Sequence, residues 1–147
     1  MADYLPDTNL LLRIGDANSP LYTVINDAIN TLRTRGDRVY LVPQNLYEFY
    51  VVATRPASAR GGFGLTPQAA KAEMNRLRST FIFRADTADV FTEWANLIDV
   101  YGVSGVQAHD ARIVAAMRVH GISNLLTFNT PDFIRYPFIN VIHPANV

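Results

Sequence analysis

Apolar residues recur along the chain in two spacings, and these spacings predict alternating strands and helices. Short runs rich in β-branched and aromatic residues, such as 38–42, are typical of buried strands. Longer stretches carry apolar residues three and four positions apart, as in 21–32 and 90–101, and predict amphipathic helices. The expected order is β, α, α, β, α, α, β, α, α, β, short α, β. Such alternation favours a parallel sheet covered by helices on both faces.

Turn and capping residues predict where these elements begin and end. The expected strands are the segment that runs into Asp7 and residues 38–42, 81–83, 125–128 and 139–142. The expected long helices begin at the capping residues Ser19, Asn45, Thr66, Thr87 and Ser104. A shorter helical turn is expected over 10–12, and a last short helix follows Thr130. The helices that begin after Ser19, Thr87 and Ser104 end at Gly36, Gly102 and Gly121.

Several acidic residues have a purely structural explanation in this pattern. Asp7 is placed to cap the helix that follows it. Glu48 stands three residues after Asn45, which predicts a capping box, and Ser104 with Gln107 predicts a second one. Asp110 falls near the start of a helix, where the dipole favours an anion whether or not it has a function.

Composition predicts one globular domain over residues 1–147, since 49% of the residues are hydrophobic and 18% are charged. The 13 basic and 13 acidic side chains cancel, so any attraction for nucleic acid must be local. The chain has no cysteine, which excludes disulfides, thiolate metal sites and thiol nucleophiles. No apolar run approaches the roughly 20 residues of a transmembrane helix. We therefore expect a soluble, cytoplasmic protein with no membrane contact.

Four carboxylates nevertheless share one topological position. Asp7, Glu48 and Asp132 each come just after an expected strand, and Asp110 comes early in a crossover helix. In a parallel sheet these positions can meet at the edge where ligands of open α/β folds bind. A set of oxygen ligands without His or Cys suits Mg²⁺ or Mn²⁺, and a cation makes crowded carboxylates tolerable. Phosphodiester hydrolysis is the chemistry that such a site favours.

At these positions the sequence resembles the PIN-domain ribonucleases, and among them the VapC-type toxins of prokaryotic toxin–antitoxin pairs. The matching stretches are Pro6-Asp7-Thr8-Asn9, Asn45-Leu46-Tyr47-Glu48-Phe49, His109-Asp110-Ala111 and Leu126-Thr127-Phe128-Asn129-Thr130-Pro131-Asp132-Phe133. Each motif alone is weak, whereas their order and spacing together are fairly specific. The resemblance covers nearly the whole chain.

The resemblance implies a PIN-like three-layer α/β/α sandwich around a mostly parallel sheet of about five strands. It also implies Mg²⁺-dependent (or Mn²⁺-dependent) cleavage of RNA, inhibition by a cognate antitoxin, and a homodimer. In that family the first and the late Asp hold the metal, which corresponds to Asp7 and Asp110 here, and Glu48 corresponds to the middle acid. The fourth position is filled by an acid or by Asn just after the fourth strand, so Asn129 and Asp132 are both candidates.

Other polar residues are secondary candidates. Thr8 and Asn9 would support the site by orienting Asp7 or a bound water, although residues of this kind are also common at helix starts. Three arginines could contact RNA, two in a basic loop and one on the helix of Asp110; they are Arg55, Arg60 and Arg112. A solvated surface explains the loop equally well and explains Arg112 better.

Three other classes of function compete with a nuclease. A PIN-like module with weak catalysis could bind only RNA or a protein, but the three best-matched acids are all present. A phosphotransfer domain would need a second Asp two residues after Asp7, where Asn9 stands. A nucleotide-binding fold would need a glycine-rich phosphate loop after a strand, and none follows.

Overall fold

Five parallel strands form the central sheet of the computed structural model, which describes residues 1–59 and 61–147. The spatial order is β3-β2-β1-β4-β5. Their bounds are β1 Asp3–Pro6, β2 Arg38–Leu41, β3 Ile82–Phe83, β4 Asn124–Leu126 and β5 Asn140–Ile142. The central strand β1 pairs with β2 on one side and with β4 on the other, where Leu5 lies opposite Leu125. The predicted parallel sheet is thus confirmed.

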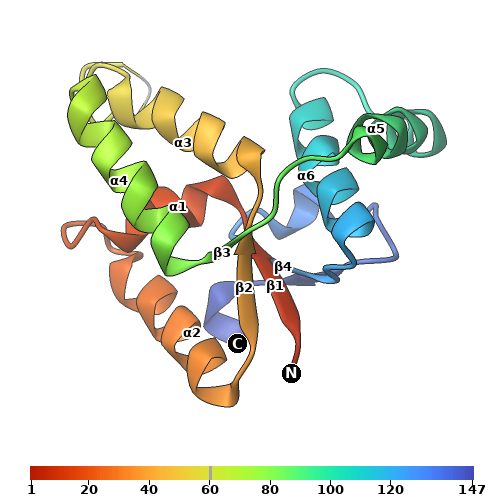
Figure 1. Ribbon diagram of the computed structural model, residues 1–147, viewed down its shortest axis with the longest axis horizontal. Coiled ribbons are helices and arrows are strands. Elements are labelled where there is room, and N and C mark those ends of the chain that lie inside the picture. The colour runs from red at the N-terminus through yellow and green to blue at the C-terminus, as the bar shows by residue number, and fades with distance from the viewer. Residues whose placement is uncertain (60) are drawn as a thin grey trace.

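Helices cover both faces of this sheet. The long helices are α1 Thr8–Ile14, α2 Tyr22–Arg35, α3 Pro43–Thr54, α4 Pro67–Thr80, α5 Ala88–Tyr101 and α6 Gln107–His120. Two short 3₁₀ helices follow, η1 Thr130–Asp132 and η2 Pro144–Asn146. Figure 1 shows α1 to α4 on one side of the strands, and α5 with α6 on the other. The fold is therefore the three-layer α/β/α sandwich that the sequence predicts.

Successive side chains along the strands point to opposite faces of the sheet, and they contribute to a hydrophobic core on each side of it. Leu5 and Tyr40 pack in the core beneath α5 and α6. Their chain neighbours Tyr4 and Leu41 pack in the core beneath α1 to α4. Successive side chains of a strand point to opposite faces, so a strand buried on both faces reads as a continuous apolar run.

The start of α3 differs from the prediction and corrects the role assigned to Glu48. The helix begins at Pro43, so Asn45 is its third residue and not its cap. Proline is favoured at the first helical position because it has no N–H and its φ already suits a helix. The Asn45 Oδ1 accepts a hydrogen bond from the Val42 N–H at 2.9 Å. The predicted capping box between Asn45 and Glu48 is therefore wrong, and the Glu48 carboxylate has other partners.

Two other helix starts also differ. The helix α6 begins at Gln107, after Val106, and its start has no side-chain cap, so the second predicted capping box is wrong. The Gln107 Oε1 accepts a hydrogen bond from Arg135 at 2.6 Å instead. The helix α2 begins at Tyr22 and not after Ser19, whose hydroxyl accepts a hydrogen bond from the Leu21 N–H in the turn before the helix. None of the helices in the described ranges is long and apolar enough to cross a membrane.

Candidate active site

The carboxylate of Asp7 is oriented by the end of a neighbouring strand. Asp7 directly follows β1, and its N–H donates to the Leu126 carbonyl at 2.8 Å, which continues the sheet for one more residue. Although Asp7 precedes α1, its side chain makes no capping hydrogen bond. Its Oδ2 accepts a hydrogen bond from the Thr127 hydroxyl at 3.0 Å. Asp7 therefore occupies the predicted N-cap position of α1, but its carboxylate does not cap the helix and lies instead at the carboxyl edge of the sheet.

Glu48 reaches the same edge from α3. Its Oε1 accepts hydrogen bonds from the Thr8 hydroxyl and from the Gln44 amide, each at 3.2 Å. Thr8 is buried, and Asn45 holds it by donating to the Thr8 Oγ1 at 3.4 Å and to the Pro6 carbonyl at 3.0 Å. Thr8 thus supports Glu48 directly, one residue after Asp7. Asn9 is exposed, and its side chain makes no hydrogen bond within the described residues.

Asp110 lies in the first turn of α6, and among the four acids its pKa departs most from the ordinary value. Burial raises its pKa to about 7, and the charges of Asp7, Asp132 and Glu48 act in the same direction, whereas Arg135 opposes them. Burial also raises the pKa of Asp7, against hydrogen bonds from Thr127 and Thr8. The charges of Glu48 and Asp132 add to that increase. Perturbed carboxyls of this kind are typical of functional sites.

The two candidates for the fourth position are placed differently. Asp132 ends η1, and its charge acts on both Asp7 and Asp110. Asn129 is exposed, and its backbone N–H donates to the Thr127 hydroxyl at 3.0 Å. Through that bond Asn129 helps to orient Thr127, the donor to Asp7. Asp132 is therefore the residue that brings charge to the cluster, and Asn129 contributes to the turn beside it.

The sequence did not point to Gln44, which connects the two helices of the site. Gln44 is only 4% exposed. Its amide donates to Glu48 and, at 2.7 Å, to the His109 carbonyl next to Asp110. Its Oε1 is buried and has no hydrogen-bond partner among the described residues. Gln44 precedes Glu48 by four positions, which is the spacing of neighbours on one helix face, but this signal appears only when the helix begins at Pro43.

For the RNA cleavage that the family resemblance implies, replacing Gln44 is expected to slow catalysis without weakening RNA binding. In Gln44→Leu, Glu48 loses one of its two hydrogen-bond donors, and the hydrogen bond from α3 to the His109 carbonyl of α6 is also lost. We therefore expect kcat to fall about 10-fold or more, as is usual when a residue that orients a site residue is removed. The KM for RNA should stay unchanged, because Gln44 is buried and does not face the substrate. Steady-state cleavage kinetics measure both constants. A kcat equal to that of the parent protein would show that Gln44 has only a packing role.

The three arginines that were predicted to contact RNA differ in their surroundings or lie outside the described residues. Arg112 donates to the Asp86 carboxylate at 3.1 Å, so its charge is paired on the helix surface. Arg55 directly follows α3 and lies about 10 Å along the helix axis beyond Glu48. Arg60 lies outside the described residues. Of the two arginines that the structure describes, Arg112 is the one on the helix of Asp110, two residues after it.

The carboxylate oxygens of the site suit a hard cation, although they do not form a complete coordination shell. Among residues 1–59 and 61–147, no three acidic or histidine side chains are grouped closely enough to hold a metal ion. Mg²⁺ seldom needs such a group, because it usually keeps several waters and binds one or two carboxylates. Burial and like charges raise the pKa values of the Asp7 and Asp110 carboxyl groups. A bound cation would offset both the desolvation of these carboxylates and their mutual repulsion. The residues present therefore fit Mg²⁺ or Mn²⁺.

Solved structures share this fold over nearly the whole chain. No protein-family model and no curated protein matches the sequence. A chain of the DNA-bound VapBC complex from Salmonella typhimurium is similar at 17% identity, with a TM-score of 0.71 over 98% of this chain and 99% of that one. A chain of VapBC2 from Rickettsia felis, bound to a fragment of promoter DNA, has 14% identity and a TM-score of 0.69 over 96% and 98%.

A third similar structure is VapC20 from Mycobacterium tuberculosis, described as a toxin that cleaves the sarcin–ricin loop. It has 21% identity and a TM-score of 0.60, over 88% of this chain and 92% of that one. At such low identities the likeness establishes the fold. The chain therefore has the fold of the VapC-type PIN-domain toxins, as the motifs in its sequence predict.

Proposed function

We propose that the protein is a cytoplasmic, metal-dependent endoribonuclease and the toxin of a toxin–antitoxin pair. The observation that carries this proposal is the cluster of Asp7, Glu48, Asp110 and Asp132. These acids come from separate parts of the chain, and their charges act on one another at the carboxyl edge of a parallel sheet. The fold shared with VapC-type toxins supports the same function.

In the proposed reaction, Asp7 at the end of β1 and Asp110 at the start of α6 would hold Mg²⁺ or Mn²⁺. A bound ion would lower the pKa of a water molecule and offset negative charge on the departing oxygen of the phosphodiester. Thr127 keeps the Asp7 carboxylate in place, and Gln44 with Thr8 keeps that of Glu48. Glu48 is then placed to orient the attacking water and to accept its proton. Asp132 adds negative charge that strengthens cation binding.

The first test is metal dependence. The purified protein should cleave single-stranded RNA with Mg²⁺ or Mn²⁺, lose that activity in EDTA and recover it when excess Mg²⁺ is added, because its carboxylates need a cation to act on a phosphodiester. The Asp7→Asn protein, purified in the same way, controls for a contaminating nuclease. Cleavage that persists undiminished in EDTA would exclude the metal mechanism. Binding of RNA without any cleavage would favour the alternative of a catalytically weak PIN-like binding module.

We also propose a cognate antitoxin and a homodimer. Similar chains occur in structures described as VapBC and FitAB complexes and as a toxin–antitoxin complex. An antitoxin that covers the site would place a basic side chain among the carboxylates, which repel one another when unpaired. Coexpression with the product of the neighbouring gene should give a copurifying complex that does not cleave RNA. An active, unpaired protein that is harmless when expressed would count against the toxin role.

A further inference from the structure

Beside the carboxylate cluster lies an arginine that the proposed reaction does not use. Arg135 follows Asp132 by three residues, in the turns between η1 and β5. Its Nη2 donates a hydrogen bond to the Gln107 Oε1 at 2.6 Å. Gln107 is the first residue of α6 and precedes Asp110 by three positions, so the two side chains are neighbours on one face of the helix. The hydrogen bond therefore holds the Arg135 guanidinium near Asp110.

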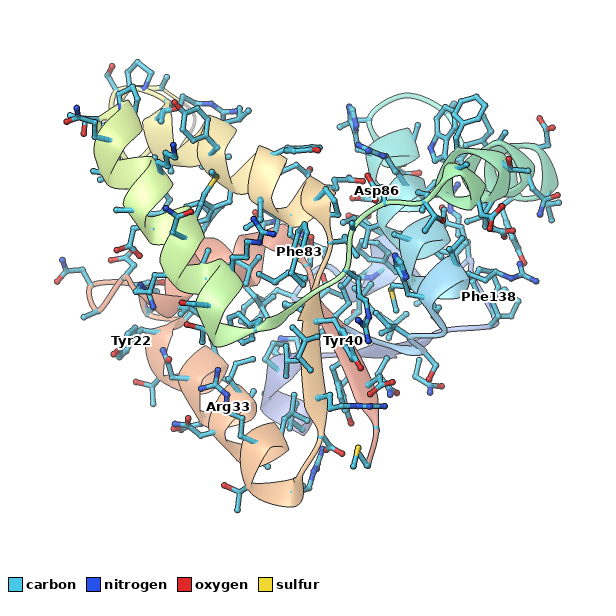
Figure 2. The ribbon with its side chains drawn as sticks, viewed as in Figure 1. Tyr22, Arg33, Tyr40, Phe83, Asp86 and Phe138 are labelled. Atoms are coloured by element: carbon cyan, nitrogen blue, oxygen red, sulfur yellow. The ribbon has the colours of Figure 1, made fainter. Side chains whose placement is uncertain are left out.

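The backbone on both sides of Arg135 is held against α6. Phe133 and Tyr136 are 1% and 2% exposed and pack in the core that α5 and α6 cover. The Phe138 ring lies with its centre 4.4 Å from the guanidinium carbon of Arg118, in the last turn of α6. Figure 2 shows Phe138 on the side of the molecule that α5 and α6 occupy. A side chain on so well anchored a segment is preorganised to bind a ligand.

The positive charge of Arg135 is only partly compensated. It lowers the pKa of Asp110, but burial and the neighbouring acids raise that pKa more strongly. Within residues 1–59 and 61–147 the guanidinium forms no ion pair, and its hydrogen bond goes to a neutral amide. The side chain is also partly exposed. A guanidinium carries several N–H donors, so some of those of Arg135 are available to an acceptor from solution.

An RNA phosphate needs such a donor at this end of the sheet. The carboxylate cluster repels a phosphodiester, and a bound divalent cation would offset only part of its negative charge. A guanidinium at the border of the cluster reduces that repulsion. Its planar arrangement of N–H groups also matches two oxygens of a phosphate. A nonbridging phosphate oxygen is therefore the acceptor that best fits the available donors of Arg135.

We propose that Arg135 binds the phosphate of the RNA linkage that is cleaved, through a nonbridging oxygen, and that Gln107 is the positioning residue for Arg135. This inference rests on the proposed ribonuclease function and adds a substrate-binding residue to its site. Arg112, which the sequence suggested for this role, is paired with Asp86. Arg135 has no such partner among the described residues.

The first measurement is the affinity of the Asp7→Asn protein for fluorescently labelled single-stranded RNA, by anisotropy in EDTA at several salt concentrations. In this protein, Arg135→Gln should weaken binding about tenfold and reduce the slope of log K against log salt by about 0.7, because one phosphate contact is lost. Arg135→Lys keeps the charge and should keep the slope. Arg118→Gln is the matched control, because Arg118 is paired with Glu93 at the other end of α6, and it should change neither value.

The second measurement changes the charge of the RNA. The cleaved linkage is located from the products that the parent protein forms with Mg²⁺, and an RNA is made with a neutral methylphosphonate at that linkage. Arg135→Gln should weaken binding of the charged RNA about tenfold and that of the neutral-linkage RNA less than about twofold, because the phosphate charge is the partner of Arg135. A loss of protein stability would affect both RNAs equally.

Gln107→Leu tests the positioning role. The substitution removes the acceptor that holds Arg135 but changes no charge. The salt slope of RNA binding should therefore equal that of the parent, whereas kcat for cleavage with Mg²⁺ should fall about tenfold, as is usual when a residue that orients a site residue is removed. A parental kcat would exclude a positioning role for Gln107.

The assignment of Arg135 is overturned if Arg135→Gln binds the charged RNA with parental affinity and slope, or if it weakens binding of both RNAs equally. Arg135→Met removes the same charge and replaces Arg135→Gln if that variant does not fold. If the parent protein cleaves RNA but the slope is unchanged in these variants, the ribonuclease function stands without Arg135. If the parent protein does not cleave RNA, the ribonuclease function fails, whereas a reduced slope still supports a phosphate contact at Arg135.

Discussion

Asp110→Asn is expected to abolish RNA cleavage and to stabilise the metal-free protein at neutral pH. Loss of a ligand that helps to neutralise several kcal/mol of transition-state charge should slow cleavage about a thousandfold or more. The gain in stability follows from the pKa of Asp110, which burial and three neighbouring acids raise from 3.8 to about 7. Asn carries no charge, so the substitution removes the free-energy cost of burying a charged carboxylate beside other acids.

The sign of the pH dependence follows from proton binding in the two states. Between pH 4 and 7 the folded protein binds a proton at Asp110 more tightly than the unfolded chain does, so the free energy of unfolding falls as pH rises. This loss of unfolding free energy is complete above the pKa of Asp110 in the folded protein, and it is absent below the pKa of Asp110 in the unfolded chain. Because Asp110 is only partly buried, solvent screening reduces the effect, and we expect Asp110→Asn to gain about 1–2 kcal/mol at pH 8 and nothing at pH 4.

Thermal unfolding in EDTA at the two pH values, together with the cleavage rate, measures both effects. Asp7→Asn should likewise abolish cleavage and leave stability equal or higher, since the pKa of Asp7 is also raised. Asp99→Asn, at an exposed position of α5, is the control and should change neither property. A lower midpoint for either active-site variant in EDTA at pH 8 would instead mark that acid as structural.

Glu48→Gln should lower the cleavage rate about a hundredfold while leaving stability almost unchanged. Gln keeps an oxygen that can accept the bonds from Thr8 and Gln44, but it has neither the charge nor the basicity to activate water. Glu48→Ala should also slow cleavage and cost about 1–3 kcal/mol of unfolding free energy, since two donors lose their acceptor. Cleavage assays at saturating Mg²⁺ and urea unfolding measure the two properties. Parental cleavage by Glu48→Gln would limit the working site to Asp7, Asp110 and Asp132.

The order of strands and helices could be predicted because each element is encoded locally. The period of the apolar residues predicts the type of each element, and the alternation of types predicts a parallel sheet. The positions of Asp7 and Asp110 follow from that topology. The two capping boxes were wrong because an Asn or Ser three residues before a Glu or Gln also occurs by chance inside or before a helix. At α3, Pro43 was the stronger start signal.

Contacts between distant segments could not be predicted in this way. Gln44 bonds to a carbonyl 65 residues away, and nothing in the sequence marks that pairing. The bond from Thr127 to Asp7 spans 120 residues. Phe91 follows the apolar period of its helix and yet is 70% exposed, because periodicity describes one helix and not what lies against it. The effect of the Asp132 charge on Asp7 and Asp110 likewise depends on where the fold places these residues, so the sequence leaves both Asn129 and Asp132 as candidates for the fourth position.

The pairing of β1 with β4 also determines when the carboxylate cluster can exist during synthesis of the chain. Tyr4, Leu5 and Pro6 at the start of the chain find their β4 partners only at residues 124–126. Until β4 leaves the ribosome, Asp7 has no Thr127 to orient it, and Asp132 has not yet been made. Pairings of such long sequence separation form late and slowly. A nascent or truncated chain that stops before β4 is therefore expected to lack the proposed cleavage activity, because its carboxylate cluster is incomplete.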